Sequence, residues 1–164
     1  MKDNCAMIDK VAFGLGKGLH GRFPVSANVR IELFGQDGAL KESREIHNTV
    51  TTAGKNGAAD QVLASPSLGK PTHMELGTGT GGSTKLNSYV ADSRSALSSK
   101  TRDGAVVTMA CTFAAGTGTG AITEAGIFDS ATQDAGNMWV YSSFDVINKA
   151  AGDSLVVTWT LTFS

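Results

Sequence analysis

The sequence has little charge and few cysteines, prolines and aromatic residues. Of its 164 residues, 18% are charged and 7% are aromatic, with three prolines and two cysteines. An average soluble domain has about 25% charged residues. The formal net charge of −1 provides no basic surface for nucleic acid or anionic lipid. We therefore expect neither nucleic acid nor a membrane among its partners.

Long apolar stretches are also missing. No segment approaches the roughly 18 apolar residues of a transmembrane helix, and the N-terminus carries Asp3 and Asp9 instead of the apolar centre of a signal peptide. These absences predict that the protein is made in a cytoplasm and first acts there.

The residue spacings of metal and catalytic sites do not occur either. Cys5 and Cys111 lie far apart, without a CxxC motif. The histidines, His20, His47 and His73, have no HxxxH or HExxH spacing. There is no Gly-x-Ser-x-Gly motif for a nucleophile. We therefore expect no metal, no cofactor and no enzyme activity.

Two weaker patterns also favour a structural interpretation. GxGxxG occurs at residues 16–21 and 77–82, but neither match lies in a strand–helix unit of the kind that binds dinucleotides, so both are predicted to be loops. The carboxylates Asp129 and Asp134 lie on a predicted turn and are interpreted as solvated.

Glycine is abundant, with 20 residues, and together with serine and threonine it favours strands and turns. Residues 25–34 and 155–163 alternate apolar and polar side chains, which indicates half-buried strands. Asp103-Gly104 predicts a hairpin. Further strands are expected at 39–47, 73–76, 93–101, 105–114, 121–128 and 138–147. About seven strands at this spacing predict one all-β domain over residues 25–164, an antiparallel β-sandwich or jelly roll.

One short helix is expected at residues 53–64. Thr52 could cap it. Its internal glycines, Gly54 and Gly57, weaken a helix, so packing must hold this one in place. Pro66 and Pro71 bracket the loop that follows.

Residues 1–24 are predicted to be a flexible, extended N-terminal arm. The segment combines glycines, whose backbone freedom opposes regular structure, with large apolar side chains. The apolar residues are the candidate partner-binding residues, namely Phe13, Leu15, Leu19 and Phe23. The alternative is a strap that packs on its own domain.

The apolar side chains of the strands form the candidate core. Val107, Met109, Cys111 and Phe113 are expected to share one face, and Trp159 is expected to point into the sandwich. Most of the C-terminal aromatic residues are interpreted as core, namely Trp139, Tyr141, Phe144 and Trp159. An aromatic cluster can also line a sugar site, so a host-glycan-binding module stays an alternative.

Several segments of the C-terminal two thirds occur in an order shared by a known group of proteins. They are 74–80 (MELGTGT), 121–128 (AITEAGIF), 136–138 (GNM), 144–149 (FDVINK) and 152–163 (GDSLVVTWTLTF). Over residues 48–163 the chain resembles a group of tailed-bacteriophage virion proteins that includes capsid decoration (cement) proteins, tail-tube-associated proteins and baseplate or fibre modules. Relatives often carry an arginine shortly before the residue corresponding to Phe144, whereas Tyr141-Ser-Ser precedes it here.

The resemblance implies a structural role in a virion. The first hypothesis is a capsid decoration protein on the capsid surface, whose partners are the major capsid protein and copies of itself as a dimer or trimer. The second is a tail fibre or baseplate subunit. The third hypothesis, of another class, is the glycan-binding module.

Overall fold

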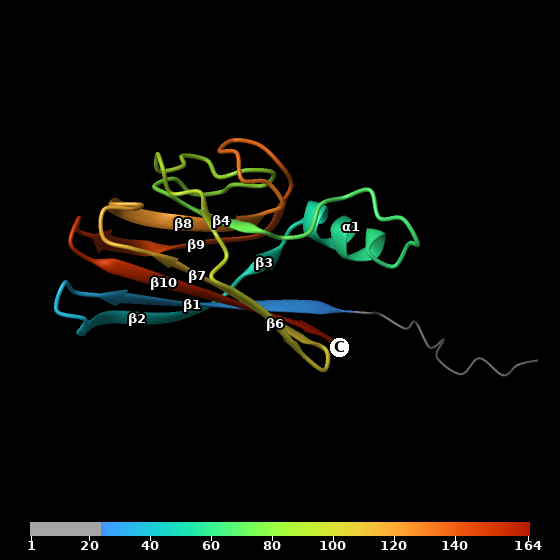
Figure 1. Ribbon diagram of the computed structural model, residues 1–164, viewed down its shortest axis with the longest axis horizontal. Coiled ribbons are helices and arrows are strands. Elements are labelled where there is room, and N and C mark those ends of the chain that lie inside the picture. The colour runs from blue at the N-terminus through green and yellow to red at the C-terminus, as the bar shows by residue number, and fades with distance from the viewer. Residues whose placement is uncertain (1–23) are drawn as a thin grey trace, which may run out of the picture.

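Two antiparallel sheets packed face to face make up most of residues 24–164, the part of the chain that this computed structural model describes (Figure 1). One short helix lies at one end. The strands are β1 (Val25–Phe34), β2 (Leu40–His47), β3 (Thr49–Val50), β4 (His73–Gly77), β5 (Ser95–Ala96), β6 (Ser99–Asp103), β7 (Val106–Phe113), β8 (Gly120–Phe128), β9 (Met138–Lys149) and β10 (Ser154–Phe163), and the helix is α1 (Thr52–Asp60). The all-β sandwich with one short helix is therefore confirmed.

The first and last strands lie side by side in the same sheet. Sheet A has the order β2-β1-β10-β7-β6, and sheet B has the order β3-β9-β8-β4-β5. In sheet A, Val25 lies opposite Phe163 and Leu33 lies opposite Leu155. The backbone N–H of Ser164 donates to the carbonyl of Pro24 over 3.0 Å, so the two ends of the described chain are held together.

The core lies between the inner faces of the two sheets. The predicted face of β7 is confirmed, because Met109, Cys111 and Phe113 are buried. Trp159 in β10 is fully buried. With the Asn48 amide oriented so that its nitrogen donates to the carbonyl of Ala27, its oxygen accepts from the indole N–H of Trp159. Trp159 therefore points into the sandwich, as its alternating strand predicts.

The expectation of one strand over residues 93–101 is wrong. Ser95–Ala96 pairs with β4 in sheet B, whereas Ser99–Asp103 pairs with β7 in sheet A. Between them, the N–H of Leu97 donates to Thr72 and that of Ser98 donates to Ala110. The chain thus crosses from one sheet to the other within two residues. The hairpin at Asp103-Gly104 is confirmed, and Gly104 has a φ of 52°.

The helix is shorter than expected and begins one residue earlier. Thr51, not Thr52, is the N-cap, because its hydroxyl oxygen accepts from the N–H of Gly54 over 3.0 Å. A Cβ added at Gly54 or Gly57 would clash with Trp139. The glycines that weaken the helix let it approach β9 closely, which confirms that packing holds it. No helix within residues 24–164 is long and apolar enough to cross a membrane.

Candidate functional site

Two loops cover the outer face of sheet B. Residues 78–94 and 129–137, which we call the cap, lie on the side of this sheet that faces away from sheet A (Figure 1). A small apolar cluster forms beneath them from Leu86, Phe128, Met138 and Tyr141. Because the sheet is buried on both faces, polar side chains that point into the cap need partners inside the protein.

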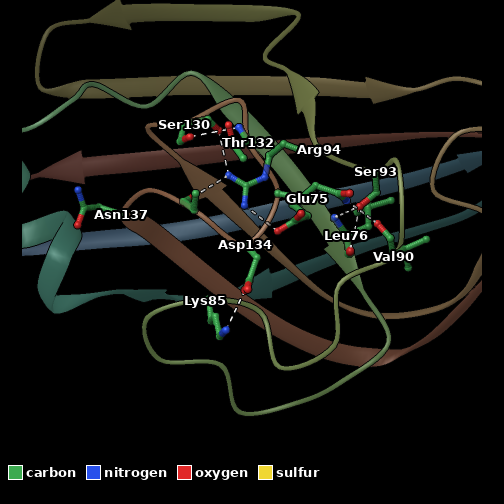
Figure 2. Close-up of polar contacts among 12 residues, drawn as sticks. Glu75, Leu76, Lys85, Val90, Ser93, Arg94, Ser130, Thr132, Asp134 and Asn137 are labelled. Carbon is green, nitrogen blue, oxygen red and sulfur yellow. Dashed lines mark hydrogen bonds and ion pairs between the residues drawn. The ribbon is translucent and has the colours of Figure 1, made fainter.

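Arg94 and Glu75 form the most buried ion pair of the described residues (Figure 2). The Arg94 Nη2 atom lies 2.8 Å from Glu75 Oε2, and both side chains are 2% exposed. Arg94 Nη1 donates to the carbonyl of Ser130 over 2.9 Å. The guanidinium carbon lies 3.7 Å from the centre of the Phe128 ring, a favourable cation–π geometry. Arg94 therefore joins both loops of the cap to β4.

Two further contacts in Figure 2 fix the same loops. The Ser93 hydroxyl accepts from the N–H of Leu76 and donates to its carbonyl, each over 3.1 Å. At the surface, Lys85 Nζ lies 2.8 Å from a carboxylate oxygen of Asp134. Within the buried pair, Glu75 Oε1 and Arg94 Nε have no hydrogen-bond partner among the described residues.

The glycine-rich loop at residues 77–82 surrounds the buried carboxylate of Glu124. The N–H groups of Gly79 and Ser88 donate to Glu124 Oε1 over 3.2 and 2.9 Å, and the Tyr141 hydroxyl donates to Oε2 over 3.1 Å. A Cβ at Gly77 would lie 2.6 Å from Glu124 Oε1. One backbone N–H of this loop, that of Gly79, is therefore used by a carboxylate of the protein itself. Burial raises the pKa of Tyr141, and the negative charge of Glu124 adds to this effect.

A second polar cluster lies at the turn that leads from β9 in sheet B to β10 in sheet A. Lys149 Nζ donates to the carbonyls of Ala114 and Asp153 over 3.0 and 2.7 Å. Burial lowers the pKa of Lys149. The Asp153 carboxylate accepts from Lys41 Nζ over 2.8 Å and from the N–H of Ala150 over 3.1 Å. The hydrogen bond from Lys41 is the main reason that the pKa of Asp153 is lowered.

The residues proposed for partner binding, Phe13, Leu15, Leu19 and Phe23, lie outside the described residues, as does the rest of 1–23. His20 and Cys5 belong to the same segment. Of the other histidines, His47 lies on β2 beside Asn28, and His73 begins β4 in the opposite sheet. In residues 24–164, no three His, Cys, Asp or Glu side chains form a group that could hold a metal ion.

The remaining candidates are placed as follows. Trp139, Tyr141 and Trp159 are 7%, 9% and 0% exposed, which confirms core packing for them, and Phe144 is half-buried. Cys111 is buried, and this burial raises the pKa of its thiol to about 12. Asp134 is exposed as expected, but Asp129 is half-buried and accepts from the N–H of Asn137 over 2.7 Å.

Sequence reasoning missed the buried charges Glu75, Arg94 and Glu124. A signal for the two glutamates was present, because each interrupts an apolar strand inside a segment that carries the resemblance. For Arg94 there was none, since it lies in an irregular loop.

A groove lies on another side of the molecule, between α1 and sheet A, because its lining includes Ala58 of the helix and Leu161 and Phe163 of β10. Figure 1 shows that β1, β6 and β10 extend past the ends of sheet B near the helix. Ala58 and Phe163 are shared by its two parts, which have volumes of about 650 and 530 Å³. Its lining is mainly apolar.

Comparison with known proteins gives no match to this chain: no protein-family model, curated protein or solved structure is similar to it. The likeness to phage virion proteins thus stays a prediction that rests on the sequence segments alone.

Proposed function

We propose that the protein is a structural component of a tailed-phage particle, and specifically a capsid decoration protein that binds the major capsid protein and copies of itself on the virion surface. The proposal joins the order of the sequence segments with one structural observation. Polar residues of those segments bind one another inside the protein.

The buried polar groups of these segments join the segments to one another in pairs. Segment 74–80 and segment 121–128 are neighbouring strands of sheet B with their following loops. They meet through Glu124, which accepts from Gly79, and through the Thr123 hydroxyl, which donates to the carbonyl of Gly79 over 2.7 Å. Segments 144–149 and 152–163 meet through Lys149 and Asp153. Catalytic sites present perturbed groups in an open cleft, whereas these groups fasten loops to strands.

A stiff domain of this kind suits a cement protein. Such a protein bridges neighbouring capsomers and must transmit load without unfolding locally. Many identical contacts around a particle multiply weak binding at each site. Loops that are tied down by buried polar contacts open less readily than loops that lack them.

The test is to purify complete phage particles produced from the same genome, with the protein labelled, and to image them. Density for the protein at many regular positions over the head is the expected result. Density confined to the tail would instead establish the fibre or baseplate alternative. Purified particles that contain none of the protein would refute both virion roles.

The glycan-binding alternative has its own test. Its motive was an aromatic cluster, and three of those four side chains are now seen to be at most 9% exposed. A sugar platform would therefore have to use other residues. Specific binding on a glycan array would support this alternative, and its absence would remove it.

A further inference from the structure

The groove beneath α1 combines an apolar floor with a basic rim. The floor includes Val107, Met109 and Leu161 from the inner face of sheet A and Ala58 from α1. Val62, which follows the end of the helix, lies at the edge of the groove. Val62 is 85% exposed, and Leu63 beside it is 60% exposed. Large apolar side chains with this exposure, next to a concave surface, are typical of a binding surface.

Four cations border the groove, and no acidic residue lines it. They are Lys55, Lys70, Lys100 and Arg102. Lys100 Nζ donates to the carbonyl of Pro71 over 2.9 Å, and Arg102 donates to that of Gly104 over 2.7 Å. None of the four forms an ion pair with a carboxylate among residues 24–164. Because the whole chain has a net charge of −1, this basic rim is a local feature.

We propose that this groove binds a peptide segment of a partner protein in which carboxylates alternate with apolar side chains. The apolar side chains would enter the floor, and the carboxylates would meet the rim, where a cation and an anion form charge-assisted hydrogen bonds. The groove runs along α1, which has nine residues. A helix rises about 1.5 Å per residue and an extended peptide about 3.3 Å, so about four residues of an extended peptide match the length of the helix.

Two other occupants fit the groove less well. Single-stranded nucleic acid would use the cations but needs a series of exposed aromatic side chains for stacking. The aromatic residues that line this site are Trp139, which is 7% exposed, and Phe163, which is half-buried. The chain's own segment 11–23 precedes Pro24, which lines the groove. That segment carries Lys17, Arg22 and no acidic residue, so its charge would oppose the rim.

The inference does not depend on a role in virions and is tested without particles. A random 12-residue peptide library is selected on the full chain, and the enriched peptides are synthesised and titrated. Peptides rich in Asp or Glu together with aliphatic or aromatic residues are expected. Their affinity should fall at least tenfold for Lys70→Glu/Lys100→Glu and severalfold for Val62→Ser, and it should weaken as salt is raised.

Matched controls use the same substitutions elsewhere. Lys85→Glu changes an exposed cation on the cap, and Val146→Ser changes an exposed valine on β9. Both should leave the affinity unchanged, and thermal unfolding should show that all four variants are folded. Enriched peptides without acidic residues, peptides that bind the groove variants as tightly as the original chain, or no enrichment at all would each overturn the proposal.

Two further probes test the rival occupants. The first probe is a 12-nucleotide oligothymidylate. The proposal is refuted, and a nucleic-acid groove identified, if three results hold: its binding requires Lys70 and Lys100, Val62→Ser leaves that binding unchanged, and no acidic peptide displaces it. A synthetic peptide of residues 1–23 that outcompetes the acidic peptides would refute it as well. We expect that the acidic peptides bind to the groove and that neither of these two probes does.

Discussion

The two sheets of this sandwich differ in how their outer faces are covered, and the burial pattern along their strands shows the difference. Along β10 of sheet A, buried and half-buried residues alternate from Ser154 to Leu161. In sheet B, the last four residues of β4, the last five of β8 and the first five of β9 are all buried. Alternation is the mark of a strand with one covered face, and continuous burial is the mark of a strand with two.

This difference determines what each sheet can contain. The outward side chains of β10 are half-buried threonines such as Thr158 and Thr160. In the ion pair on neighbouring β1, Arg30 is 58% exposed and Glu32 is 21% exposed. Sheet B instead contains Glu75 and Glu124, each at most 1% exposed. A buried carboxylate is tolerated only where donors converge on it. The stability of sheet A therefore depends on core packing, and that of sheet B depends also on the polar contacts of the cap.

The largest effect is expected at Trp159 in sheet A. Trp159→Ala should lower the free energy of unfolding by about 3–5 kcal/mol, because it removes a fully buried indole from the core. Thr160→Ala, one residue along on the outer face, should cost under about 1 kcal/mol. Chemical denaturation of both variants measures the contrast. Equal losses would mean that the outer face of sheet A is as closely packed as the inner one.

Sheet B should be sensitive to the loss of a charge. Arg94→Met keeps much of the side-chain volume but leaves Glu75 buried without its cation, which should cost about 3 kcal/mol at neutral pH. The double variant Arg94→Met/Glu75→Leu should recover most of the loss. Denaturation curves at pH 7 measure these changes. A double variant as unstable as Arg94→Met alone would show that packing against Phe128, not charge, is what Arg94 contributes.

The same difference explains what the sequence could predict. Strands β1 and β10 follow from period-two alternation alone, and Asp103-Gly104 marks its hairpin. The cap is invisible to that method, because the partners of Glu124 are backbone N–H groups of Gly79 and Ser88, far away in the chain. The crossing of residues 95–99 from sheet B to sheet A depends on the carbonyls that accept from Leu97 and Ser98, which belong to the distant residues Thr72 and Ala110. Neither fact has a local signal. Glu75 and Glu124 do interrupt apolar strands, but the sequence does not show which groups bind them, so these buried contacts were missed.

A smaller effect is expected where α1 meets sheet B. Gly57→Ala should destabilise the protein by about 1–3 kcal/mol, because its methyl group would overlap the ring of Trp139 and push the helix away. Asn56→Ala on the exposed side of the same helix should be neutral or slightly stabilising, since alanine favours helices. Denaturation and Trp fluorescence would report both changes. A stabilised Gly57→Ala variant would show that helix propensity, not contact with β9, limits this element.

The smallest effect is expected for the polar cluster at the end of sheet A, and it should depend on pH. Asp153 has a lowered pKa in the folded protein, chiefly because of its hydrogen bond from Lys41. A carboxyl of this kind adds stability above its unfolded pKa of about 4, and the contribution is lost as the pH falls through the folded pKa. Lys41→Met should therefore lower the thermal midpoint slightly at pH 7, with the difference from the original protein closing as the pH falls below about 4.

Lys55→Met is the matched control for this prediction, because Lys55 is exposed and pairs with no carboxylate of the described residues. Its thermal midpoint should follow that of the original protein at every pH. If the difference for Lys41→Met stays constant from pH 7 to pH 3, the charge on Asp153 is not its source. The cause would then be the packing of the Lys41 stem, and sheet A would depend on apolar contacts even at its polar end.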